Sequence, residues 1–309
     1  MQSQRSPKNL FLFMVMAIFL ASCSLNSPGG NENNSTQFPA AETPLPTQPQ
    51  STATVTSTPA PLAMKINDVG IALSDYEAQL VILRSALQER GDELSEQETQ
   101  QLVVDYLVEL ELLAQSARAQ GRSISTEELD QKVAEFAANL GGEAGFESWL
   151  AMTGYSREAF RVAYQRELEA AWQRDNIASQ VKENTEQVQA RQILVFEKDL
   201  AQQIYQRLQL GADFATLAED YDPVTKGDLG WFPRGYLFHP EIEEAVFMLL
   251  PGQYTEVIET SIGFHIVQVI AREESHPLSS DARLVLVRNA LKEWLDYQRT
   301  HSRIEMLIE

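Results

Sequence analysis

The stretch GDLGWF, at residues 227–232, decides the fold of its part of the chain together with IGFHIVQV, at residues 262–269. In the first stretch, two glycines separated by an acid and a leucine predict a tight backbone turn that leads Trp231 and Phe232 into an apolar interior. In the second, the alternation of a β-strand places His265 on the same face as the valines that follow it. A histidine is therefore predicted to point where its neighbours are apolar.

A second strand is predicted upstream, at QARQILVF, residues 189–196. Alternation along this strand places Gln192 on the same face as Leu194 and Phe196. Two predicted strands thus each carry one inward polar side chain, Gln192 in one and His265 in the other.

In the order of these pieces, residues 188–272 resemble the parvulin family of peptidyl-prolyl isomerases. Five ordered blocks carry the resemblance: ARQILV at 190–195, GADFATLA at 211–218, the glycine turn, PEIEEAVF at 240–247 and GFHIV at 263–267. Each block alone is an ordinary turn, helix or core strand, whereas five with the family's spacing are far more specific. The resemblance implies an α+β fold over residues 188–274, with a parvulin (FKBP-like) antiparallel sheet and flanking helices.

Prolyl isomerisation makes and breaks no covalent bond, so it needs neither a nucleophile nor a cofactor. The barrier of about 18–20 kcal/mol comes from amide resonance. A catalyst lowers it with a dry apolar pocket for the proline ring and with polar groups that stabilise a twisted amide. The resemblance implies a ring-binding pocket formed by Leu229, Leu237, Ile242 and Phe247. It implies a polar floor, and hence the catalytic groups, at His265, Thr260, Gln192 and Asp222. A purely structural role for His265, as a buried imidazole bonded to Thr260 that orders the sheet, stays open beside the catalytic role.

The chain departs from the parvulin pattern at three places. Gln192 stands where the family usually has the first of two inward histidines, and an amide cannot titrate as imidazole does, so weak activity is expected. The loop at residues 220–226 is short, which leaves the match of Asp222 open by one position, with Asp220 as the alternative. Ile242 replaces a common aromatic residue, which keeps the pocket apolar but removes a flat wall for the proline ring.

The first strand passes almost directly into a helix at residues 197–199, which leaves no room for the basic loop of phosphate-directed parvulins. The expected partners are therefore unfolded or extended client polypeptides that contain proline. Two functions remain as alternatives: a foldase with a working isomerase, or a non-catalytic holdase whose altered site only grips extended chains. Gln192 favours the holdase, whereas His265, Thr260 and the glycine turn favour the isomerase.

Residues 1–23 have the pattern of a secretion signal, because Arg5 and Lys8 precede an apolar run, residues 10–20, that is short for a bilayer span. The sequence LASC at residues 20–23 resembles a bacterial lipobox, in which the cysteine is lipidated and becomes the mature N-terminus. The resemblance implies an extracytoplasmic protein anchored to the cell membrane through Cys23. An ordinary secretion signal with a chance cysteine is the alternative. Since the chain has no other cysteine, an intrachain disulfide is impossible.

Residues 24–62 are rich in Ser, Thr, Pro, Asn and Gln and contain hardly any aromatic residues. Such a composition cannot bury enough apolar surface to offset its conformational entropy, so a disordered linker is predicted. Its prolines favour an extended tether. A glycosylated stalk is an alternative that the same composition allows.

Residues 63–187 are predicted to form a helical domain after a short strand, turn and strand at residues 65–73. Apolar spacing predicts helices at residues 74–88, 96–120, 146–152 and 156–182, and Ser125 with Glu128 has the pattern of a capping box before another helix. The sequence LVELELLAQSA, at residues 107–117, resembles the all-α N-terminal chaperone domain of SurA-like and PrsA-like foldases.

Residues 275–309 are predicted to contain a final helix that starts at Ser279 or Ser280 and runs to about Ile308. Its apolar stripe consists of Leu284, Val287, Leu291, Trp294, Leu295 and Ile304. In the foldases that the chain resembles, such a helix returns to the helical domain, so the isomerase domain would be an insertion. The alternative, an exposed tail helix, would leave Trp294 in water.

The chain has a formal net charge of −20 and a pI near 4.6, so it lacks the basic stripe that nucleic acids require and would be repelled by anionic lipid. Membrane attachment is thus expected to rest on the Cys23 lipid. Its four histidines show no metal-ligand spacing, and neither a nucleophile elbow nor a phosphate-binding glycine loop occurs. Metalloenzyme, hydrolase and kinase functions are therefore not expected, no cofactor is implied, and no pattern indicates an oligomeric state.

Overall fold

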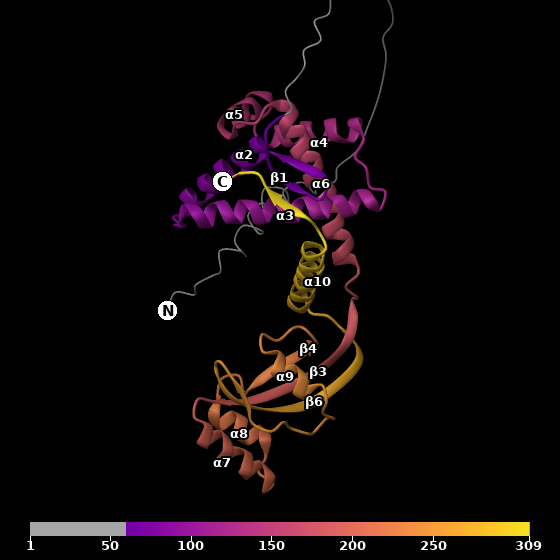
Figure 1. Cartoon of the computed structure of the whole chain (residues 1–309). Coiled ribbons are helices and arrows are strands. Elements are labelled where there is room, and N and C mark those ends of the chain that lie inside the picture. The colour runs from indigo at the N-terminus through magenta and orange to yellow at the C-terminus, as the bar shows by residue number, and fades with distance from the viewer. Residues whose placement is uncertain (1–59, 309) are drawn as a thin grey trace, which may run out of the picture. The chain divides into compact units, whose positions relative to one another are not determined.

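The computed structural model describes residues 60–308, which form two compact units (Figure 1). Unit 1 contains residues 60–110, 125–165 and 303–308, and unit 2 contains residues 111–124 and 166–302. The predicted signal segment, Cys23 and all but the last residues of the predicted linker lie outside the described residues. None of the helices within residues 60–308 combines the length and the apolar character that crossing a membrane requires.

Helices make up most of unit 1, as the sequence predicts. They are α2 (Leu73–Arg90), α3 (Glu96–Ala119), α4 (Thr126–Asn139), α5 (Glu143–Thr153) and α6 (Arg157–Ser179), of which α3 and α6 continue into unit 2. Ser125 caps α4 by accepting the backbone N–H of Glu128 at 3.1 Å. The ring of Phe160 lies 5.1 Å from that of Phe136 and 5.2 Å from that of Phe146. These aromatic contacts hold α4, α5 and α6 together.

A small sheet of order β2-β1-β7 completes unit 1. β1 (Leu62–Ile66) and β2 (Val69–Ala72) form the predicted hairpin, with Asn67 in the turn at a φ of 55°. β7 (Ile304–Met306) pairs with the other edge of β1, and the backbone N–H of Asn67 donates to the carbonyl of Arg303 at 2.7 Å. The last residues of the described chain thus belong to the same sheet as the first ones.

The final helix is shorter than predicted. Ser279 caps α10 (Ser280–Thr300) by accepting the N–H of Ala282 at 3.1 Å, in agreement with the predicted start. The predicted end at Ile308 is wrong, and so is the place of Ile304 in the helical stripe, because Ile304 lies in β7. The free edge of β1 offers backbone partners to an extended segment but not to a further helical turn. The packing of α10 on the helical domain stays a prediction.

Unit 2 contains an antiparallel sheet of order β4-β3-β6-β5. Its strands are β3 (Asn184–Val195), β4 (Asp228–Pro233), β5 (Ile258–Thr260) and β6 (Gly263–Pro277), and its helices besides α10 include α7 (Lys198–Gln209), α8 (Phe214–Tyr221) and α9 (Pro240–Val246). In the central pair of strands, Leu194 of β3 lies opposite His265 of β6, and Gln192 lies opposite Val267. The predicted α+β fold class is confirmed.

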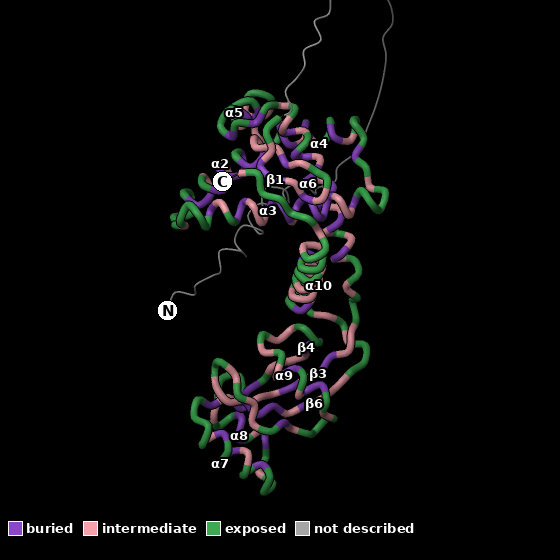
Figure 2. Tube along the Cα trace, viewed as in Figure 1, coloured by how far each residue is buried: buried purple, intermediate pink, exposed green. Residues whose placement is uncertain are grey.

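The two faces of this sheet carry different apolar cores, and the buried parts of β3 and β6 can be followed in Figure 2. One core joins the sheet to α7 and α8 and includes Ile193, Val195, Ile204, Leu217 and Ile266. The other joins the sheet to α9 and includes Val188, Ala190, Phe232, Val246, Val267 and Val269. Neighbouring residues such as Ile266 and Val267 enter different cores because successive side chains of a strand point to opposite faces.

Two aromatic residues differ from the prediction. Phe232 is fully buried, but Trp231 is only half-buried and stacks on His276, with 4.2 Å between the ring centroids. Both residues lie in β4, so alternation allows only one of them to enter the apolar core. Phe196 follows the last residue of β3 and is 76% exposed, so it does not share the inward face of Gln192.

Candidate active site

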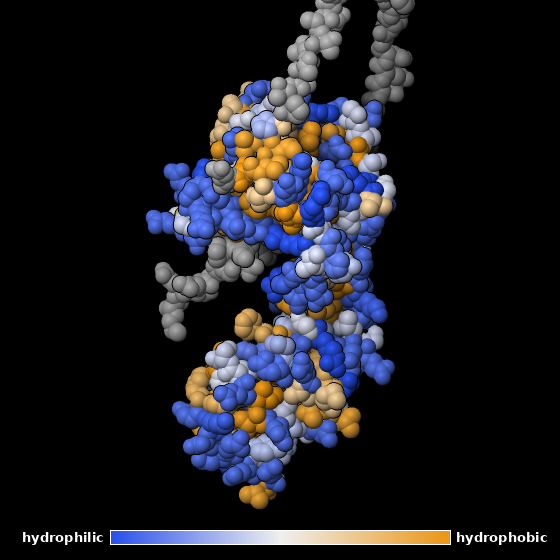
Figure 3. All heavy atoms as spheres, in the orientation of Figure 1, coloured by the Kyte–Doolittle hydropathy of each residue, from blue (hydrophilic) through white to orange (hydrophobic). Residues whose placement is uncertain are grey.

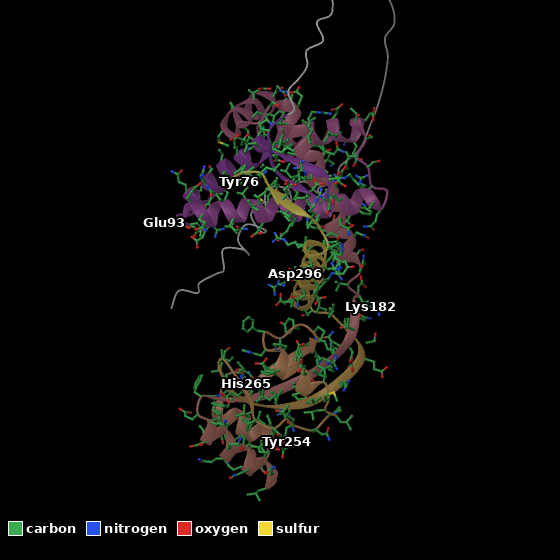
Figure 4. The ribbon with its side chains drawn as sticks, viewed as in Figure 1. Tyr76, Glu93, Lys182, Tyr254, His265 and Asp296 are labelled. Atoms are coloured by element: carbon green, nitrogen blue, oxygen red, sulfur yellow. The ribbon has the colours of Figure 1, made fainter. Side chains whose placement is uncertain are left out.

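His265 is almost completely buried in β6, with 1% of its surface exposed, and both of its ring nitrogens have partners. Its Nδ1 atom lies 2.8 Å from Oε1 of Gln192, and its Nε2 atom lies 2.9 Å from Oγ1 of Thr260. Figure 4 labels His265 in the sheet of unit 2. The structure therefore brings together three of the four polar residues that the sequence predicts.

The hydrogen bonds of His265 indicate which tautomer it adopts. An amide oxygen can only accept, so the assigned orientation of Gln192 places a proton on Nδ1. In the neutral imidazole, Nε2 then accepts from the hydroxyl of Thr260, for which the carbonyl oxygen of Gly263, at 3.3 Å, is a second and more distant acceptor. Thr260 Oγ1 itself accepts the backbone N–H of Ile262 at 3.1 Å. Burial lowers the pKa of the His265 imidazole, and His239 lowers this pKa further, whereas Glu241 raises it. The lowered pKa favours the neutral form of the imidazole.

The amide nitrogen of Gln192 is a free donor within the part of the chain that the structure describes. Gln192 uses its oxygen for His265, and none of residues 60–308 accepts from its Nε2 atom. The residue is only half-buried. An amide in this state can donate a hydrogen bond to a carbonyl group of a bound polypeptide.

The glycine turn lies directly against Gln192. The backbone N–H of Gln192 donates to the carbonyl of Gly227 at 2.8 Å. Gly227 has a φ of 69°, and a Cβ atom at this position would lie only 1.9 Å from the carbonyl oxygen of Gln192. A residue without a side chain is required here by both the backbone conformation and the close approach. The turn therefore fixes the position of a site residue as well as the start of β4.

Asp222, the fourth predicted polar residue, lies at the C-terminal end of α8. Its carboxylate accepts the backbone N–H groups of Val224 at 3.2 Å and Thr225 at 3.0 Å, and also the hydroxyl of Thr225. The side chain of Thr225 and then its backbone N–H hold the pKa of Asp222 below its usual range. These contacts place Asp222 in its own loop rather than in the His265 cluster. Asp220, the alternative, is exposed in the last turn of α8.

The four predicted pocket residues belong to one apolar cluster on the α9 side of the sheet. Ile242 and Phe247 are buried within it, whereas Leu229 and Leu237 pack against it and stay half-exposed. Val267, two residues after His265, lies in the same cluster. The predicted apolar residues therefore belong to the core on the strand face that carries His265, with two of them buried and two reaching the surface.

His239 is a neighbour of the site that the sequence pattern did not predict. Its ring centroid lies 6.1 Å from that of His265, and its Nδ1 atom lies 3.3 Å from a carboxylate oxygen of Glu241. Phe238 precedes it, contacts its ring at 5.2 Å between centroids, and is 90% exposed. Apolar side chains are visible on the surface of unit 2 in Figure 3. In the sequence, His239 directly precedes Pro240, which is typical of the first position of a helix. This pattern could have placed His239 at the start of α9, the helix that carries the pocket residue Ile242.

No group of three or more His, Cys, Asp or Glu side chains within residues 60–308 is arranged to hold a metal ion. The groups gathered around His265 are an imidazole, an amide, a hydroxyl and apolar side chains. Such a set can bind an extended polypeptide and donate hydrogen bonds to its amides.

Two known domain families match the sequence. The PPIC-type PPIase domain matches residues 170–271, and the SurA-like N-terminal domain matches residues 48–174.

Curated relatives include foldases and chaperones. The foldase protein PrsA of Caldanaerobacter subterraneus subsp. tengcongensis is 47% identical over 92 residues, which cover 28% of this chain and 30% of that protein. PrsA of a Geobacillus species is 34% identical over 127 residues, 40% of this chain and 45% of that protein. The chaperone SurA of Nitrosococcus oceani is 30% identical over 145 residues, 40% of this chain and 34% of that protein. The matched segments span less than half the length of these relatives.

Among solved structures, the peptidylprolyl isomerase PrsA from Bacillus cereus aligns with 76% of this chain and 85% of its own, at 22% identity and a TM-score of 0.43. The isomerase PrsA from Bacillus anthracis aligns with 62% of this chain and 91% of its own, at 23% identity and a TM-score of 0.38.

Proposed function

We propose that this chain, which combines a SurA-like N-terminal domain with a PPIC-type peptidyl-prolyl isomerase domain, is a foldase that catalyses cis–trans isomerisation of prolyl bonds in client polypeptides. The observation that carries the proposal is the buried imidazole of His265, hydrogen-bonded to Gln192 and Thr260 beside an apolar cluster. The direct test is whether the full chain accelerates a refolding reaction that prolyl isomerisation limits.

In the proposed mechanism the protein lowers the barrier without covalent chemistry. The half-exposed Leu229 and Leu237 hold the proline ring, and the displacement of water around the amide disfavours its planar, resonance-stabilised state. The free amide N–H of Gln192 donates to a carbonyl group beside the twisted bond. His265 has both nitrogens occupied, so it acts by holding Gln192 and Thr260 in place. Asp222, whose carboxylate is bonded within its own loop, is kept as the fourth proposed catalytic group.

Replacing Gln192 with histidine is expected to raise the isomerisation rate by about tenfold, which corresponds to about 1.4 kcal/mol of transition-state stabilisation. An imidazole at this position could accept from Nδ1 of His265 and offer its own N–H to the substrate, with charge sharing that an amide lacks. The kcat/KM of the full-length Gln192→His variant, compared with that of the parent, checks this. An equal or lower value in a variant with an unchanged circular dichroism spectrum would contradict it.

We further propose that the protein acts outside the cytoplasm, anchored to the membrane through a lipid on Cys23. The LASC sequence after the apolar run at residues 10–20 supports this proposal. The intact mass of the protein from the membrane fraction of its native host is expected to show a diacylglycerol-modified N-terminus at Cys23. A Cys23→Ala variant is the control and should leave the membrane fraction. A soluble native product that is cleaved at another residue would refute the anchor.

A further inference from the structure

The loop at residues 234–239 joins β4 to α9 and carries side chains that face the candidate site. Leu237 is one of the two half-exposed pocket residues, and the exposed Phe238 and the partly buried His239 follow it. A small shift of this loop would move the apolar wall that is proposed to hold the proline ring. The contacts that fix the loop therefore bear on client binding.

Glu243 fixes the loop from α9. This carboxylate is only 7% exposed, and its two oxygens accept the backbone N–H of Gly235 at 2.7 Å and that of Leu237 at 2.5 Å. Hydrogen bonds to an ionised acceptor are stronger than those between neutral groups. One side chain therefore holds the backbone on both sides of Tyr236.

Asn289 contacts the same loop from α10. Its Nδ2 atom donates to the carbonyl of Gly235 at 2.7 Å. Gly235 has a φ of 79°, and a Cβ atom built there would lie 3.5 Å from Leu286 of α10. The N–H of Gly235 is thus hydrogen-bonded to Glu243 of α9, and its carbonyl is hydrogen-bonded to Asn289 of α10.

We propose that Asn289 and Glu243 are positioning residues for client binding, which hold the loop at residues 234–239 in the conformation that grips a proline-containing segment. This inference rests on the proposed function. It extends the site to α10, which lies beyond the residues 170–271 that match the isomerase family.

The test uses the full chain and two substitutions with matched controls. Asn289→Asp keeps the shape of the side chain but replaces the donor with an acceptor, and Gln298→Glu makes the same chemical change elsewhere on α10. Glu243→Gln removes the charge and one acceptor, and Glu244→Gln does so at the exposed neighbouring residue. Two properties are measured: the dissociation constant of a short fluorescent peptide with one central proline, and backbone hydrogen exchange in residues 234–239.

Asn289→Asp and Glu243→Gln are each expected to weaken peptide binding by about three- to tenfold, the effect of one hydrogen bond, and to speed exchange in the loop. The kcat should stay within about twofold, and both controls should match the parent. Unchanged loop exchange, or faster exchange with an unchanged peptide affinity, would overturn the proposal. A parent chain that binds the peptide but does not isomerise it would refute the proposed function, whereas the affinity and exchange results would still decide the role of the loop.

Discussion

Replacing His265 with alanine is expected to lower kcat/KM for prolyl isomerisation by about tenfold to a hundredfold, or about 1.4–2.7 kcal/mol. The substitution removes two hydrogen bonds at a position that is 1% exposed. It leaves the Gln192 oxygen without its partner, whereas the Thr260 hydroxyl keeps its contacts with Ile262 and Gly263. Polar groups left unpaired in a buried site are costly, and a loosened Gln192 cannot hold its free N–H toward the substrate. A protease-coupled peptide assay over a range of substrate concentrations measures the loss.

Thr260→Val serves as the graded control for this prediction, because it removes one of the two partners of His265 and leaves the imidazole in place. Its expected loss of activity is smaller than that of His265→Ala. Circular dichroism and thermal unfolding of both variants must show a folded protein at the assay temperature, since a cavity in a core also lowers stability. A folded His265→Ala variant with at least half of the parent activity would contradict the proposed role of the imidazole.

Among substitutions that add one methyl group in unit 2, Gly227→Ala is expected to cause the largest loss of folding stability. A Cβ atom would lie 1.9 Å from the carbonyl oxygen of Gln192, and the φ of 69° disfavours a side chain in any case. The left-handed conformation alone costs about 1–2 kcal/mol, and displacement of the β3 backbone adds about 1–3 kcal/mol. Activity should fall as well, because the backbone that moves is that of Gln192.

Gly230→Ala separates the two parts of this cost. Gly230 has a φ of 66°, but a Cβ atom there would meet nothing within 4 Å. This variant should therefore show only the conformational cost and keep its activity. Thermal unfolding of the two variants measures the difference, and equal losses of stability at Gly227 and Gly230 would contradict the close-approach argument.

Strand alternation and the resemblance to parvulins together predicted the centre of the site. Alternation in residues 189–196 and 262–269 placed Gln192 and His265 on the inward face of their own strands, and the resemblance placed both in one polar floor. In the structure, Nδ1 of His265 lies 2.8 Å from Oε1 of Gln192. The same rule, applied to β4, would have shown that Trp231 and Phe232 cannot both enter the core. The turn was recognised from its two glycines, but its contact with Gln192 was not, because that contact joins residues 35 positions apart, 227 minus 192.

Other features depend on partners that no local pattern reveals. β7 is a three-residue strand whose partner, β1, lies near the other end of the described chain, so its residues were assigned to the preceding helix. Glu111 lies within the stretch that resembles a chaperone helix, yet it is fully buried and pairs with Arg118 and with Arg166, the latter at 2.8 Å. A charged residue on a helix is normally expected in water, and only the fold shows that its partners are nearby.

The most direct test of the central claim is the refolding of a protein whose slow phase is limited by prolyl isomerisation, followed at increasing concentrations of the full chain. The uncatalysed step takes tens to hundreds of seconds, so even a weak catalyst is measurable. We expect the rate of the slow phase to rise in proportion to the concentration of the parent chain, more steeply with Gln192→His and hardly at all with His265→Ala. If neither the parent nor Gln192→His accelerates this phase while both bind the unfolded protein, the chain is a holdase and the isomerase account is wrong.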